Sequence, residues 1–131
     1  MHYVGRINRN FYQGITNGKI ITDEVIITDN RIQHIIERRG KDFYEQYHKY
    51  FCDILENPDY IFKDKAENTA IVSKTIIHNG VNINLVVRII VEDDDEKFKN
   101  SIITAIKEND KRFRQRLRNN KPIYKNVDIN E

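Results

Sequence analysis

The chain is poor in cysteine and in long apolar runs, two features that identify a protein class directly. Its one cysteine, Cys52, excludes an intramolecular disulfide and favours a reducing compartment. No apolar run reaches the roughly 18 residues that cross a bilayer. The first nine residues also lack the apolar centre of a signal peptide. We therefore expect a cytosolic protein that has no membrane partner.

Several enzyme motifs are absent as well. The histidines and the cysteine do not have metal-ligand spacing, and neither a phosphate loop nor a Gly-rich dinucleotide fingerprint is present. No nucleophile elbow supports a Ser/His/Asp triad. The all-acidic run 92–96 can attract a cation, although such a run is more often a solvated loop. We expect neither a metal nor another cofactor.

Charged residues are common in this chain, and the two signs are concentrated in different segments of the sequence. The net charge is only +2, although 32% of the residues are charged. Seven cations and no acid lie between residues 111 and 125. Such segregation creates an attractive field on one surface even when the total charge is small. A negatively charged partner is one interpretation of the basic segment, and a solvated, salt-bridged helix is the other.

Hydrophobic periodicity predicts one α+β domain over residues 1–131. Residues 1–20 are expected to form an N-terminal extension or hairpin, with strands near 3–7 and 11–15, and residues 21–125 the core. Within the core, a strand at 25–27 should lead into two helices.

The two helices are expected at 29–40 and 41–56, joined at Gly40. Asp29 can cap the start of the first helix, and Gly40 can close its end in a left-handed conformation. Together they would form a helical hairpin.

From residue 60 the pattern changes to that of strands. Strands are expected at 60–62, 69–77, 83–92 and 101–107, with a turn signal at 78–80. A basic helix follows at 109–119, and its apolar stripe is Phe113 and Leu117. The predicted fold is an N-terminal helical hairpin packed on an antiparallel sheet of about four strands, with a basic C-terminal helix.

His34 is the best chemical lead. At about 100° per residue it lies opposite the isoleucine stripe of its helix, and Arg38 is one turn away. A histidine can exchange a proton near neutral pH. Metal-independent RNA cleavage by the 2′-hydroxyl needs such a group and positive charge around the phosphorane. The alternative is an ordinary charged helix face exposed to solvent.

The strands and the last helix contain further candidates. Arg88 interrupts an apolar strand, so it must reach the surface, pair with a carboxylate or contact a ligand. Ser101 and Thr104 on the next strand can donate to a phosphate. Arg112 and Arg116, one turn apart, can follow a phosphate backbone. Tyr124 can stack on a base.

The order of these motifs resembles the phage-associated nuclease-like domains of the barnase–EndoU–colicin–RelE group. The resemblance covers roughly residues 20–125. It rests on Arg31–Arg38, Glu56–Ile61, Asn68–Thr69 with Lys74, Leu85–Arg88, Lys99–Thr104, Lys111–Arg112 and Tyr124–Lys125. It implies a small metal-independent ribonuclease with helices before an antiparallel sheet, in the host cytosol or associated with a virion.

The resemblance points to His34 and Arg38, to Lys74 and Arg88, and to Ser101 and Thr104. With the candidates above, the expected catalytic set is His34, Arg38, Arg88, Ser101 and Thr104, and the expected RNA-binding set is Lys74, Lys107, Lys111, Arg112, Arg116 and Tyr124. Two positions depart from the family pattern. Arg39 stands where a second histidine is common, and Ala105–Ile106 stands where an aromatic pair is common.

RNA is therefore the expected partner, and a cognate inhibitor or a host protein is a further one. The departure at Arg39 leaves two alternatives to catalysis by His34 alone. Another acid, namely Glu37, Lys74 or His48, can complete the chemistry. Otherwise the chain is a non-catalytic module, such as an inhibitor of a host nuclease or defence complex, or a virion-associated domain.

Overall fold

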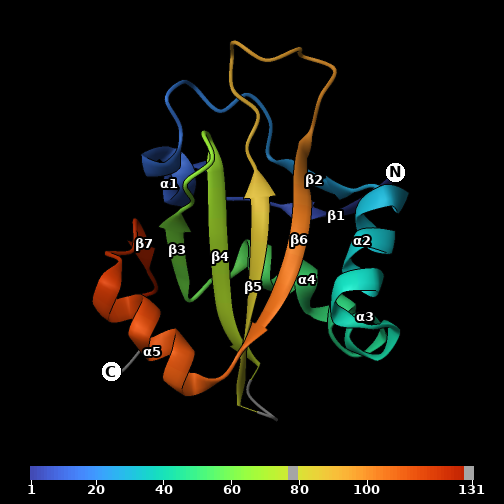
Figure 1. Cartoon of the computed structure of the whole chain (residues 1–131). Coiled ribbons are helices and arrows are strands. Elements are labelled where there is room, and N and C mark those ends of the chain that lie inside the picture. The colour runs from blue at the N-terminus through green and yellow to red at the C-terminus, as the bar shows by residue number, and fades with distance from the viewer. Residues whose placement is uncertain (77–79, 129–131) are drawn as a thin grey trace.

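A computed structural model describes residues 1–76 and 80–128 and has an α+β fold built on one mixed sheet (Figure 1). The seven strands lie in the order β1-β2-β6-β5-β4-β3-β7. Neighbouring strands are antiparallel except β2 and β6, which are parallel. The strands are β1 (His2–Arg6), β2 (Glu24–Ile27), β3 (Tyr60–Lys63), β4 (Thr69–Ile76), β5 (Val81–Arg88), β6 (Asn100–Glu108) and β7 (Tyr124–Lys125).

The helices lie around this sheet (Figure 1). In the figure, α2 runs beside β6, α4 lies behind the sheet, and α5 lies at the lower left, below β3 and β7. The helices are α1 (Arg9–Tyr12), α2 (Asp29–Arg39), α3 (Lys41–Tyr47), α4 (Phe51–Glu56) and α5 (Asp110–Asn119), with 3₁₀ turns at Gln13–Ile15 and His48–Tyr50.

The main core lies on the α4 side of the sheet. Successive side chains of a strand point to opposite faces, and Ile83, Leu85 and Val87 are the fully buried members on this side of β5. They pack in one cluster with Ile35 from α2 and Ile54 from α4. Burial of this cluster fixes which face each strand turns toward the helices.

The other face of the three central strands is polar over much of its area, and we call it the polar face. Strand register places Ser73 opposite Asn84, and Arg88 opposite Ser101. The polar face consists of Thr69, Ile71, Ser73, Thr75, Asn82, Asn84, Val86, Arg88, Ser101, Thr104, Ile106 and Glu108. Beside it, Phe113 of α5 packs against Tyr60 and Phe62 of β3.

The first long helix and the last one agree with the sequence. α2 spans Asp29–Arg39 and α5 spans Asp110–Asn119, and Phe113 and Leu117 are the apolar contacts of α5. The cap of α2 was assigned wrongly, because the Thr28 hydroxyl accepts from the Arg31 N–H. Gly40 has φ 100° and ψ 151°, a positive φ outside the left-handed helical region.

The predicted helical hairpin is not matched in detail. The second helix, expected at 41–56, is divided into α3 and α4 by the 3₁₀ turn at His48–Tyr50. Tyr47 and Phe51, on the two sides of that turn, are both buried in the main core. Core packing of these aromatic side chains is maintained although the helix is interrupted.

The sheet is larger than the predicted four strands, because β1, β2 and β7 extend its edges. Residues 11–15 are not a strand: α1 and a 3₁₀ turn form there, and the Asn8 side chain accepts from the Asn10 N–H at the start of α1. Tyr12 and Ile15 are fully buried. The strand expected at 83–92 ends at Arg88. Residues 77–79, which hold most of the expected turn, lie outside the described residues.

Candidate functional site

A β-bulge places two of the candidate hydroxyls on the polar face. Residues three apart on a regular strand point to opposite faces. On β6, however, Thr104 pairs with Val86 and Ile102 pairs with the next residue, Val87. Ile103 is therefore an extra residue in β6, and it returns Ser101 to the face that holds Thr104 and Arg88. The bulge brings these three sequence candidates to one surface.

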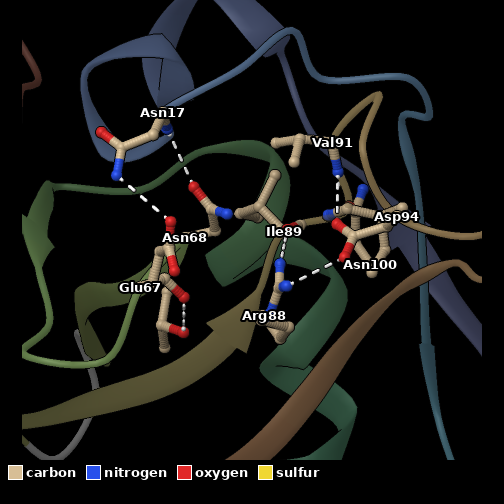
Figure 2. A network of polar contacts seen from close by, with 10 residues as sticks. Asn17, Glu67, Asn68, Arg88, Ile89, Val91, Asp94 and Asn100 are labelled. Atoms are coloured by element: carbon tan, nitrogen blue, oxygen red, sulfur yellow. Dashed lines mark hydrogen bonds and ion pairs between the residues drawn. The ribbon is translucent and has the colours of Figure 1, made fainter.

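Arg88 is held by the loop that follows its own strand (Figure 2). Its Nη2 donates to Asp94 Oδ1 at 3.1 Å, and its Nη1 donates to the carbonyl oxygen of Ile89. The second oxygen of Asp94 accepts from the Val91 N–H at 2.9 Å. Since 31% of the Arg88 side chain is exposed, a ligand can still contact it. Of the three alternatives for Arg88, two are observed: the side chain pairs with a carboxylate and reaches the surface.

Asn68 and Asn100 form hydrogen bonds with the backbone of the loops around Arg88 (Figure 2). The side chain of Asn100 accepts from the Ile90 N–H and donates to the Thr22 carbonyl oxygen. The carbonyl of Asn68 accepts from the Ile89 N–H, and its side chain accepts from the Asn17 N–H. Asn68 is buried and has φ 53°. These contacts fix the backbone around Arg88 on both sides.

A second polar chain crosses the other end of the polar face. Ser73 donates to Asn84, and Asn84 donates to Glu108. Arg116 of α5 donates to both carboxylate oxygens of Glu108, at 3.1 Å from Nε and 2.9 Å from Nη2. Burial raises the pKa of Glu108, but hydrogen bonds from Arg116 and Asn84 and the positive charges of Arg116 and Arg112 outweigh it. The net pKa is lowered.

A hollow of about 380 Å³ lies beside this chain, between α5 and the end of β6. On α5, Gln115 and Arg116 lie three and four residues after Arg112, and Asn119 lies three after Arg116. These residues therefore share one side of the helix. The hollow is lined by Ile106, Glu108, Arg112, Gln115, Arg116, Asn119 and Asn120.

The leading candidates on α2 stand apart from these ion pairs. His34 is partly buried and Arg38 is exposed. Among the residues that the structure describes, neither side chain makes a hydrogen bond or an ion pair. Arg39 donates from Nε to the carbonyl oxygen of Ala105 at 3.1 Å, which ties the end of α2 to β6. Thus Arg39 and Ala105, at the two positions that the resemblance singled out, contact each other.

Comparison with known protein families matches residues 7–125 to the phage-Barnase-EndoU-ColicinE5/D-RelE like nuclease2 family. The chain belongs to this nuclease family. No curated protein and no solved structure matches the chain.

Three candidates of this nuclease chain lie away from the polar face. The Lys74 Nζ donates to the Asn57 carbonyl oxygen at 2.7 Å and lies 3.6 Å from Asp59 Oδ1, and Lys74 shares a face with Ile83 of the core. Lys107 also pairs with Ile83. Tyr124 stacks on Phe11 with ring centroids 4.1 Å apart. The remaining basic candidates, Lys111, Arg112 and Arg116, lie on α5.

Sequence reasoning missed the polar chain of Ser73, Asn84 and Glu108. A signal was present, since Asn82 and Asn84 alternate with apolar residues in a strand and share a face with Arg88. A buried amide needs hydrogen-bond partners, and this pattern could have directed attention to that face.

Two features are absent from residues 1–76 and 80–128 of this nuclease chain. That part of the chain contains no group of three or more His, Cys, Asp or Glu side chains placed to hold a metal ion. It also contains no helix of the length and apolarity that crossing a membrane requires.

Proposed function

We propose that the chain is a metal-independent endoribonuclease that binds RNA across the polar face, beside α2 and α5. Membership of a nuclease family supports a nuclease activity. The observation that carries the proposal is the bulge at Ile103, because it places the Ser101 and Thr104 side chains beside Arg88. Two hydroxyls and a guanidinium on one surface can hold the oxygens of one phosphate group.

The hydroxyl group of Thr104 gives further support for phosphate binding at this position. Its Oγ1 is buried and has no hydrogen-bond partner among the described residues. A buried polar atom without a partner costs about 1–3 kcal/mol. In our proposal the partly buried Thr104 side chain turns its hydroxyl toward a phosphate oxygen when RNA is bound. The phosphate then accepts from the hydroxyl, and the cost is removed.

The proposed reaction is attack by the RNA 2′-hydroxyl on its own 3′-phosphate. His34 accepts the hydroxyl proton, the new bond forms from the 2′-oxygen to phosphorus, and the bond from phosphorus to the 5′-oxygen breaks. The leaving oxygen takes a proton, from solvent or from a second acid such as Glu37. Arg38 and Arg88 stabilise the additional negative charge of the phosphorane.

The position of α2 supports a role for His34. The contact between Arg39 and Ala105 ties α2 to β6 one residue from Thr104. His34 and Arg38, one turn apart, share a side of that helix, and they make no competing ion pair in the described part of the chain. Exposed Lys111 and Arg112 at the start of α5 would contact flanking phosphates.

The test is incubation of the chain with single-stranded RNA in EDTA, followed by analysis of the product ends. We expect fragments that carry a 2′,3′-cyclic phosphate and a 5′-hydroxyl. The matched control is an oligonucleotide of the same sequence with 2′-O-methyl riboses, which must stay intact. Cleavage of that control, or cleavage that requires a divalent ion, would contradict the proposal.

One observation favours a second candidate, a non-catalytic module that binds a protein inhibitor or a host protein. Arg88 and Arg116 are both paired with carboxylates, Asp94 and Glu108. A surface of paired charges also suits a protein interface. RNA that remains intact while the chain forms a stoichiometric complex with one host protein would support this second function.

A further inference from the structure

The side of α5 that lines the hollow differs from the side that anchors the helix. Phe113 and Leu117 face the aromatic residues of β3. The neighbouring stripe of polar residues borders the hollow and faces Ile106 and Glu108 of β6. Helical spacing explains both stripes, because residues three and four apart share a side. Packing of the apolar stripe therefore fixes the direction of the polar one.

The polar groups that line the hollow are side-chain amides and an ion pair without net charge. Gln115 and Asn119 each carry a donor and an acceptor, and neither makes a hydrogen bond within the described residues. Arg116 uses Nε and Nη2 to hold Glu108, so this pair adds no net charge. Partly buried Ile106 adds an apolar surface. Among the described residues of the lining, Arg112, in the first turn of α5, is the cation that makes no ion pair.

We infer that this hollow is a subsite for one unpaired nucleobase of RNA, with the attached phosphate beside Arg112. The inference rests on the proposed function and specifies its substrate as single-stranded RNA. Amides that offer both a donor and an acceptor match the edge of a base, and a guanidinium plane held in one orientation is a surface on which a base stacks.

A phosphate is the less suitable occupant of the hollow. The Glu108 carboxylate borders it and would repel a phosphate, while Arg116 is already neutralised by that carboxylate. A volume of about 380 Å³ is at the lower end of the range for small-ligand sites. The sequence interpretation of Arg116 as a phosphate contact is therefore replaced by a contact with a base.

The experiment is an NMR titration of the full chain with AMP, GMP, CMP and UMP, and with ribose 5-phosphate as the ligand without a base. We expect the side-chain amide resonances of Gln115 and Asn119 to shift with at least one nucleotide and not with ribose 5-phosphate. Gln115→Ala and Asn119→Ala should each raise the Kd of that nucleotide about 3- to 10-fold, which is the effect of one lost hydrogen bond.

Arg118→Gln is the matched control, because it removes a charge from α5 outside the lining of the hollow. It should change the nucleotide Kd less than about twofold, since the two amide side chains are retained. Equal shifts with ribose 5-phosphate, or unchanged affinity in both amide variants, would overturn the inference. Binding does not require cleavage. A chain that binds a base but leaves RNA intact contradicts only the proposed function, and a chain that cuts RNA without base-dependent shifts contradicts only this inference.

Discussion

Asp94 holds Arg88 with one carboxylate oxygen and the backbone N–H of Val91 with the other, at 3.1 and 2.9 Å. The loop that follows β5 therefore supplies a negative charge to the arginine at the end of that strand. In the proposed ribonuclease, a phosphate of RNA would compete with Asp94 for Arg88. The ion pair positions Arg88 in the absence of RNA and opposes RNA binding at the same time.

Asp94→Asn tests this competition. We expect the free energy of unfolding to fall by about 1 kcal/mol, because the ion pair is partly exposed. RNA affinity should rise about two- to fivefold, because Arg88 keeps its charge and loses its competitor. Chemical denaturation and fluorescence anisotropy with 2′-O-methyl RNA give the two quantities. Asp93→Asn removes the same charge from the exposed loop, and an equal gain of affinity in that variant would contradict the competition.

Thr104→Val separates stability from function. The hydroxyl has no partner in the described structure, and its replacement by a methyl group should leave the free energy of unfolding unchanged or raise it by up to about 1 kcal/mol. Cleavage should fall about 10- to 100-fold through loss of a donor to the phosphorane. Thr16→Val, in the loop where that hydroxyl donates to Gly18, should leave the cleavage rate unchanged. Cleavage of RNA by Thr104→Val at the wild-type rate would contradict a role for this hydroxyl in the reaction.

The lowered pKa of Glu108 predicts a pH dependence of stability. The folded state binds the proton more weakly than the unfolded state. The Glu108 carboxylate therefore stabilises the fold above the ordinary glutamate pKa of about 4.3, and this stabilisation is lost as pH falls through the folded-state pKa. Glu108→Gln should lower the free energy of unfolding by about 1–3 kcal/mol at pH 7. The difference from wild type should shrink below about pH 4, and a difference that grows there would contradict the assignment.

Phe113→Ala tests how α5 is held against the sheet. Phe113 packs on Tyr60 and Phe62 and is nearly buried, so the truncation should cost about 3 kcal/mol of unfolding free energy. Urea denaturation measures the cost. Leu117→Ala, at the partly buried end of the same stripe, should cost less, and a reversed order would contradict this packing.

Local patterns in the sequence predicted α2 and α5, because their apolar stripes repeat at helical spacing and polar caps precede them. The short α1 was missed, since four residues carry too little periodicity to outweigh β-branched and aromatic neighbours. β7 was missed for the same reason: it has two residues and is defined by its pairing with β3.

The site was less predictable than the helices. Residues 101–107 read as one regular strand, and nothing in that run marks Ile103 as a bulge, since a bulge is set by pairing with β5. The sequence made Tyr124 a candidate for stacking on a base, but Phe11, more than a hundred positions away, stacks on its ring. Contacts between segments that are distant in the sequence determine the surroundings of such residues. A local sequence pattern carries no information about those contacts.

The measurement that tests the account most directly is the initial rate of RNA cleavage in EDTA for His34→Ala, compared with His48→Ala. His48 was one candidate for a second acid, but it lies in the 3₁₀ turn before α4 and contacts Tyr44. Its neighbours Tyr47 and Phe51 pack in the main core, on the side of the sheet away from the polar face. The account therefore gives His48 no role in cleavage and uses it as a histidine control. The account predicts that His34→Ala cuts at least about 100-fold more slowly, as expected for loss of a general acid or base. It predicts that His48→Ala cuts at the wild-type rate. Cleavage by His34→Ala at the wild-type rate would contradict the account.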